Sequence, residues 1–146
     1  INAKKLNIKI QLDIYGMKFE EIDPKANNIF YKGKLKHSDR LKIMSKYDFL
    51  ISASKTEGLP ITIIECMAIG LPFITTNVGA IEDLLINNYP YIINSKNFNI
   101  IEVICSALND HNKNKTKLKS LIVANRDLFN EKFQYSKFFK NIKKIL

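Results

Sequence analysis

Residues 48–70 read DFLISASKTEGLPITIIECMAIG: a short apolar run, a turn and a second apolar segment. The first run, over residues 48–53, predicts a buried strand, and residues 60–69 predict a buried helix that Gly70 ends. Gly58 lies between them, where the chain must turn sharply. A strand that is followed at once by a helix is the unit from which parallel α/β sheets are built.

The same alternation continues along the chain in both directions. Further short strands are predicted over residues 8–15, 28–32, 72–76 and 91–93. Further helices are predicted over residues 38–46 with Ser38 as N-cap, over 80–86, 97–108, 115–130 and 136–145, the last within a C-terminal helical segment, 131–146. We therefore expect one α/β domain over residues 1–146, with a Rossmann-like open parallel sheet and flanking helices.

The start of the helix predicted over residues 60–69 suits an anion. Pro60 fits the first helical position, because its missing N–H would be unpaired there and its φ is preset. The N–H groups of Ile61 and Thr62 would then point out of the helix start, where the macrodipole is positive. A phosphate is the anion that such a place most commonly binds.

Two glutamates flank this helix start. Glu65 lies one turn beyond Thr62 in a helix otherwise suited to burial, and a buried carboxylate needs hydrogen-bond donors. Sugar or ribose hydroxyls would be such donors, and Glu57 would approach the same space from the preceding loop. Alternatively, Glu65 accepts from neighbouring backbone N–H groups and Glu57 only faces water.

The order of these residues resembles the donor-binding half of a GT-B glycosyltransferase, most closely the large family 4 group of retaining enzymes. The resemblance rests on residues 48–60 and on residues 65–82, ECMAIGLPFITTNVGAIE, and runs from about residue 8 to residue 94. It includes two glutamates, Glu57 and Glu65, separated by seven residues as is usual in that family. It implies the C-terminal half of the GT-B fold, with the first strand of that half upstream of Ile1.

The resemblance implies roles for the residues around the turn. Glu57 matches the family's first glutamate, and as the catalytic residue it would bond hydroxyls of the donor sugar. Glu65 matches the second glutamate and would accept from the nucleotide ribose. The turn at Gly58 and Leu59 would present N–H groups to the donor's sugar and diphosphate, and Thr62 would lie near that diphosphate.

Two other loops carry weaker similarity. Gly33 and Leu35, after the second predicted strand, resemble the family's turn whose backbone lies against the nucleotide base. Ser54 matches a serine that shapes the loop before Glu57. Gly79 matches the first residue of a Gly-Gly pair in the next loop, and Ala80 departs from the second.

For a parent enzyme, the resemblance implies transfer of a sugar from a UDP- or GDP-sugar donor with retention at the anomeric carbon, in cell-surface polysaccharide or glycan synthesis. No metal or other cofactor is expected. The acceptor domain, for a saccharide or lipid-linked acceptor, and the Arg and Lys that neutralise the donor phosphates would lie upstream of Ile1. We therefore expect a truncated donor domain that binds nucleotide weakly and is inactive alone.

The net charge of +9 is concentrated at the C-terminus, where residues 111–146 hold 10 basic and 2 acidic groups. Basic helices there would allow peripheral contact with an anionic membrane, phosphate-bearing acceptor or nucleic acid, of which nucleic acid is not the expected partner. Alternatively, the lysines reflect compositional bias, since Ile, Lys and Asn make up 60 of 146 residues.

Other features exclude several classes of protein. The apolar runs are far shorter than the roughly 18 residues of a membrane-spanning helix, and the chain opens without a secretory signal. Cys66 and Cys105 lack the spacing of a zinc site or a disulfide framework and are read as buried thiols in a reducing compartment. We therefore expect a cytoplasmic location, with any membrane contact at the inner face.

Three alternatives remain open on the residues alone. A GT-B-type nucleotide-sugar epimerase would share the donor pocket and lack an acceptor site. A receiver-like or flavodoxin-like binding module would have the same alternation of strands and helices, although a receiver needs acidic residues at its strand ends. A basic nucleic-acid-binding domain would show strongly salt-dependent binding.

Overall fold

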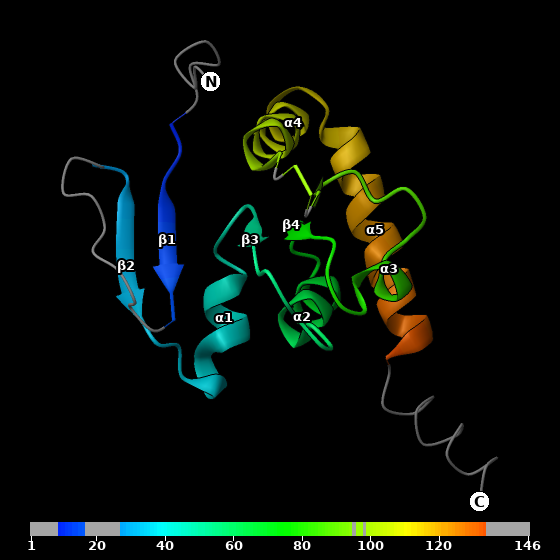
Figure 1. The fold of residues 1–146 in the computed structure, drawn as a ribbon, viewed down its shortest axis with the longest axis horizontal. Coiled ribbons are helices and arrows are strands. Elements are labelled where there is room, and N and C mark those ends of the chain that lie inside the picture. Colours follow the sequence, from blue (N-terminus) through cyan, green and yellow to red (C-terminus); the bar gives the residue numbers. More distant parts are fainter. Residues whose placement is uncertain (1–8, 17–26, 95, 98, 134–146) are drawn as a thin grey trace, which may run out of the picture. The chain divides into compact units, whose positions relative to one another are not determined.

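The computed structural model of the chain describes residues 9–16, 27–94, 96–97 and 99–133 (Figure 1). The chain divides into two compact units, Ile1–Ile43 and Met44–Leu146. The expectation of one domain over residues 1–146 stays a prediction. No helix among the described residues is long and apolar enough to cross a bilayer.

The first unit contains two parallel strands, β1 (Leu12–Tyr15) and β2 (Ile29–Gly33). They pair with Leu12 opposite Ile29, and their register shifts after Ile14. None of the described residues in this unit is buried, and apolar side chains of both strands are exposed. This two-stranded sheet therefore has no buried core among the described residues.

A 3-10 turn over His37–Asp39 leads into α1 (Arg40–Met44), whose last residue already belongs to the second unit. Ser38 lies inside that turn, and Lys36 occupies the N-cap without a capping side-chain bond. The prediction of Ser38 as N-cap is therefore wrong. Because the 3-10 turn begins at His37, one residue before Ser38, the serine lies inside the turn and not at the N-cap position.

The second unit is built on a three-stranded parallel sheet in the order β3 (Leu50–Ser52), β4 (Phe73–Thr76), β5 (Ile92–Ile93). Leu50 lies opposite Phe73, and Thr75 lies opposite Ile92. Every residue of the central strand β4 is buried, as expected for a parallel strand covered on both faces. Each of these three strands falls within a predicted strand segment.

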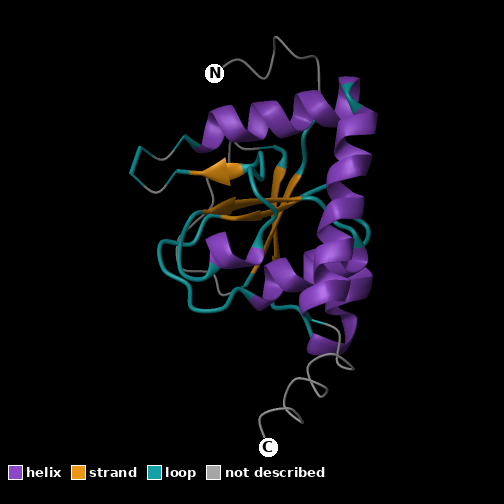
Figure 2. Cartoon of the chain, turned by 90° about the vertical axis from the view of Figure 1, so that its right-hand side faces the viewer, coloured by secondary structure: helices purple, strands orange, loops and turns teal. Residues whose placement is uncertain are grey.

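Four helices of the second unit lie within the described residues: α2 (Ile61–Ile69), α3 (Ile81–Leu84), α4 (Ile100–Lys113) and α5 (Lys115–Lys132). α5 packs on α2 and on α4, and Figure 2 shows the two longest helices, α4 and α5, meeting at a corner. The predicted helix over residues 136–145, and most of the segment 131–146, lie outside the described residues. The predicted α/β class, with parallel strands and flanking helices, is confirmed.

One core joins these elements. It combines residues of α1, α2, β4, α3, β5, α4 and α5 with Leu71 and with the two tyrosines just before β5: Met44, Ile63, Cys66, Met67, Leu71, Phe73, Ile74, Ile81, Tyr89, Tyr91, Ile93, Val103, Ala107, Leu118 and Leu121. Phe73 stacks on Tyr89 with ring centroids 4.6 Å apart. The Tyr89 hydroxyl donates to the Phe73 carbonyl over 2.7 Å, which ties the segment before β5 to β4.

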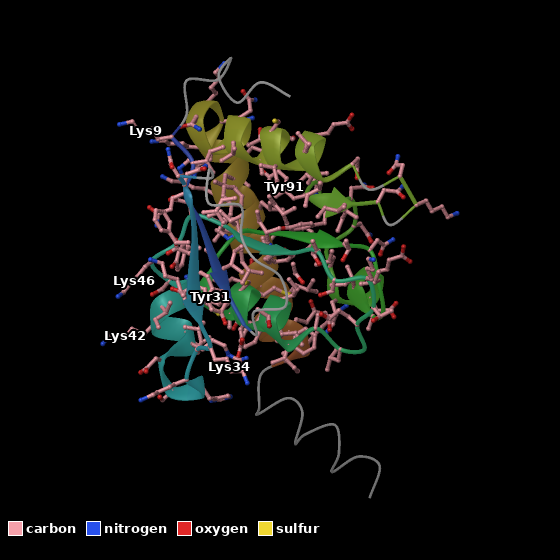
Figure 3. The ribbon with its side chains drawn as sticks, turned by 60° about the vertical axis from the view of Figure 1, so that its left-hand side comes forward. Lys9, Tyr31, Lys34, Lys42, Lys46 and Tyr91 are labelled. Atoms are coloured by element: carbon pink, nitrogen blue, oxygen red, sulfur yellow. The ribbon has the colours of Figure 1, made fainter. Side chains whose placement is uncertain are left out.

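α4 extends five residues beyond its predicted end at residue 108, to Lys113. Tyr91, which lies beside α4 (Figure 3), donates from its hydroxyl to Asp110 over 3.0 Å. Lys117 of α5 donates to the same carboxylate oxygen over 2.6 Å. Asp110 is buried, so these bonds satisfy its charge and hold the last turn of α4 in place. Burial raises the pKa of Tyr91 above its ordinary value, and the hydrogen bond to Asp110 and the negative charge of that carboxylate raise it further.

Candidate functional site

The loop between β3 and α2 carries the predicted catalytic residue. It leaves the carboxyl end of β3, the edge at which open α/β sheets bind ligands. Residues 54–59 of this loop are called the Glu57 turn below. Glu57, Gly58 and Leu59 are all exposed, and the Leu59 side chain is 53% exposed. The turn is therefore available to a ligand.

Pro60 closes the Glu57 turn in a way that the sequence did not predict. The Ile61 N–H donates to the Leu59 carbonyl over 2.9 Å, and Pro60 between them has φ −77° and ψ 84°. This is an inverse γ-turn, and the proline ring presets its φ. Pro60 is thus the N-cap of α2, so its prediction as first helical residue is wrong. The prediction of an outward-pointing Ile61 N–H is also wrong.

Residues 76–80, from the last residue of β4 to the residue before α3, lie against the Glu57 turn. Thr76 donates from its hydroxyl to the Ser54 carbonyl over 2.6 Å. The Ala80 N–H donates to the Gly58 carbonyl over 3.2 Å. One hydrogen bond to a backbone carbonyl therefore lies on each side of Glu57, and residues 76–80 donate both.

Gly79 makes the closest approach to the turn. It has φ +60°, and a Cβ built on it would lie 2.1 Å from the Glu57 carbonyl oxygen and 2.7 Å from that of Gly58. Neither distance leaves room for a side-chain atom, so glycine is required here. Ala80, which departs from the family's glycine pair, is half-buried and its N–H makes the bond to Gly58.

Glu65 lies on α2, one turn after Thr62 and on the same face of the helix. Both residues are half-buried, and the Oε2 atom of Glu65 is shielded from solvent. Burial raises the pKa of the neighbouring Cys66 thiol, and the charge of Glu65 raises it further. The predicted carboxylate is thus present at the boundary between the core and the surface.

Gly33 and Leu35 belong to the first unit. Gly33 ends β2 with φ +77°, and Leu35 is half-buried just after it. A sharp turn at the end of this strand agrees with the geometry expected there. The approach of this turn to the nucleotide base, like the ligand-binding roles of Glu57, Gly58, Leu59, Thr62 and Glu65, stays a prediction.

Sequence reasoning missed the part that Thr76 takes in this site. A threonine at the end of a predicted strand looks like an ordinary strand residue, and its partner is a backbone carbonyl 22 positions away. The pairing of β3 with β4 brings the two together, and it is a tertiary feature. Among the described residues, no group of three or more His, Cys, Asp or Glu side chains is placed to bind a metal ion.

Comparisons with known proteins identify relatives of this chain. The family model described as glycosyl transferases group 1 matches residues 1–110. An uncharacterized glycosyltransferase of Methanocaldococcus jannaschii is 27% identical over 132 residues, which cover 83% of this chain and 36% of that protein. The crystal structure of TarM aligns with a TM-score of 0.67 and 19% identity, over 96% of this chain and 29% of TarM. The chain therefore spans about a third of the length of these proteins.

Proposed function

Because the chain belongs to the glycosyl transferases group 1 family, we propose that its second unit binds the nucleotide-diphosphate sugar donor of a sugar-transfer reaction. The observation that carries this proposal is the exposed Glu57 turn, which two hydrogen bonds from Thr76 and Ala80 and the close approach of Gly79 hold at the carboxyl end of the sheet. A carboxylate that orients a ligand by hydrogen bonds must itself be held in one position.

In the proposed complex, Glu57 accepts hydrogen bonds from hydroxyls of the donor sugar. Glu65 accepts from the ribose, and Thr62, at the start of α2, lies beside the diphosphate with the backbone of Gly58 and Leu59. The positive end of the α2 macrodipole favours this placement of the phosphates.

We assign the remaining steps to the parent protein. There the donor diphosphate leaves as the sugar passes to a saccharide or lipid-linked acceptor with retention at the anomeric carbon, in cell-surface glycan synthesis. Stabilisation of that leaving group is the main catalytic requirement, and N–H donors with cationic side chains meet it without a metal. Glu57 and Glu65 orient the donor and need not exchange protons with it.

A thermal-shift screen against UDP, GDP, ADP and their sugars tests the donor site. A ligand at about 100 times its Kd stabilises the folded state by about 2.7 kcal/mol, which raises Tm by a few degrees in a chain of this size. We expect one base to give the largest shift, and Glu65→Gln to remove it. Glu102→Gln, at an exposed position on α4, is the matched control and should keep the shift.

The screen has a clear negative outcome. If neither this chain nor the longer parent protein shows a shift with any of these ligands, the donor site does not exist. If the shift survives in both Glu65→Gln and Glu57→Gln, nucleotide binding occurs elsewhere on the chain.

We further propose that the corner between α4 and α5 contacts an anionic membrane surface. Lys113, Lys115 and Lys119 are exposed there, and the first turn of α5 contains no acidic residue. Basic residues of this kind are attracted to anionic lipid headgroups. Co-sedimentation with phosphatidylglycerol vesicles at low salt should capture the chain and release the Lys113→Glu/Lys115→Glu/Lys119→Glu variant; no capture of the unmodified chain would contradict this contact.

A further inference from the structure

We propose that Thr76 and Gly79 are positioning residues, which set the place of the Glu57 carboxylate and thereby the recognition of the donor's sugar. This inference rests on the proposed function, because it assigns the way in which the Glu57 turn of that donor site is held. It concerns two residues that make no contact with the donor in the proposed complex.

The Glu57 side chain is exposed, so burial in the core does not fix it. Its position therefore depends on the backbone that carries it. Ser54, three residues earlier, accepts from Thr76, and Gly58, one residue later, accepts from the Ala80 N–H. These two bonds bracket Glu57 and anchor it to the end of a fully buried strand.

Thr76 is well suited to serve as the rigid end of this link. It is the last residue of β4, only 2% exposed, and its hydroxyl reaches the Ser54 carbonyl over 2.6 Å. β-branched side chains have few rotamers in a strand, so the direction of this hydroxyl is constrained. Thr75, its neighbour, is equally buried but donates within its own strand, to the Thr76 carbonyl over 3.3 Å.

Gly79 contributes because it has no side chain, which lets the backbone of the Glu57 turn approach it closely. The carbonyl of Glu57 itself occupies the volume in which a side chain at position 79 would begin. A methyl group there would force the Glu57 turn away from residues 76–80 and move the carboxylate with it. Gly70 also has positive φ, +73°, but the atoms nearest to a Cβ there belong to the side chains of Ile122 and Arg126 on α5, and not to the backbone of the Glu57 turn.

Titration calorimetry on the 146-residue chain separates positioning from folding. For each variant, the Kd of UDP is compared with that of UDP-glucose, and the Kd of GDP with that of GDP-mannose, well below the variant's Tm. The Kd of the nucleotide divided by the Kd of the nucleotide sugar measures recognition of the sugar, and a larger ratio means stronger recognition. We expect Thr76→Val and Gly79→Ala to lower that ratio at least fivefold, while affinity for the nucleotide alone changes less than threefold.

Three controls make the result specific. Thr76→Ser keeps the hydroxyl and should restore the ratio. Thr75→Val removes a buried hydroxyl and Gly70→Ala adds a methyl group at positive φ, both elsewhere in the second unit, and both should leave the ratio unchanged. In a Glu57→Gln background, Thr76→Val should lower the ratio no further, because the two changes act on one interaction.

Each outcome decides the question. If the unmodified chain binds the nucleotide sugar better than the nucleotide and both variants keep that preference, positioning is overturned and the donor site stands. If Thr76→Val acts equally strongly in the Glu57→Gln background, it does not act through Glu57. If neither the unmodified chain nor the longer parent protein binds nucleotide, the proposed function fails and this inference fails with it; if only the parent protein binds, the same variants are compared in it. Should Gly79→Ala not fold, Thr76→Val alone carries the test.

Discussion

Cys66 shows at the scale of one residue how burial changes chemistry. Its side chain is fully buried in α2, and desolvation holds the pKa of its thiol well above the ordinary value, with the Glu65 charge as a smaller cause. A thiol that stays protonated is a poor nucleophile. Cys66 therefore acts as a small apolar core residue, whereas Cys105 on α4 is only half-buried.

Alkaline pH should reveal this shift as a loss of stability. The folded chain keeps the Cys66 proton at pH values where the unfolded chain, with a thiol pKa of about 8.5, releases it. The unfolded state binds fewer protons, so the free energy of unfolding falls by about 1.4 kcal/mol per pH unit above that value. Between pH 7 and pH 10 the expected loss is about 2 kcal/mol.

Urea unfolding under reducing conditions, from pH 7 to pH 10, measures this loss. The contribution should be absent in Cys66→Ala and retained in Cys105→Ala, whatever the absolute stability of each variant. Burial also raises the pKa of Tyr89 and Tyr91, but their effect on stability begins only above their unfolded pKa of about 10. An equal alkaline loss in Cys66→Ala would refute the assignment to this thiol.

The end of α2 shows at the scale of one element how local chemistry determines structure. Gly70 has φ +73°, and its N–H lies 3.4 Å from the Met67 carbonyl. The Leu71 N–H donates to the Cys66 carbonyl over 2.9 Å. These two bonds form a Schellman motif, which satisfies carbonyls that the helix end would leave unpaired.

Gly70→Ala should destabilise the chain by about 1–2 kcal/mol, since alanine adopts the left-handed conformation at that cost. The new Cβ would also lie 3.2 Å from the Ile122 side chain of α5. Gly58→Ala is the matched control, because Gly58 has no left-handed φ and nothing lies within 4 Å of a Cβ there. Chemical denaturation of both variants checks the difference; equal stability would show that this helix end tolerates the strain.

At the scale of the whole molecule, the two units differ in how much they bury. The core residues all belong to the second unit, and the described residues of the first unit include none that is buried. Burial of apolar surface is the main source of stability, so the first unit should open at a much lower free energy.

Hydrogen exchange at paired amides tests this expectation. The Leu12 N–H of β1 donates to Asn28 over 2.8 Å, and the Thr75 N–H of β4 donates to Tyr91 over 3.1 Å, so both are bonded in the folded chain. Amides of β1 and β2 should nevertheless exchange on the order of 100-fold faster than those of β4. Equal protection of the two sets would mean that the units unfold together.

Local signals were sufficient to predict most of the elements. The apolar runs that became β3, β4 and β5, and the glycine that ends α2, depend on neighbours within a few residues, so pattern and backbone preference identify them. The same applies to α5, whose start at Lys115 follows Asn114, the side chain of which accepts from the Lys117 N–H as a cap. The ordered glutamate and glycine motif likewise indicates the family.

The α/β class, the place of the Glu57 turn and the family can therefore be inferred from the order of the residues. The contacts that hold that turn cannot, because Thr76, Gly79 and their partners are some 20 residues apart and meet through the pairing of β3 with β4. The tertiary structure also makes Asp110 a buried residue of α4, since its hydrogen-bond partners are Tyr91, just before β5, and Lys117 of α5. Such contacts depend on how elements pack, and a one-dimensional pattern records only which residues are neighbours along the chain.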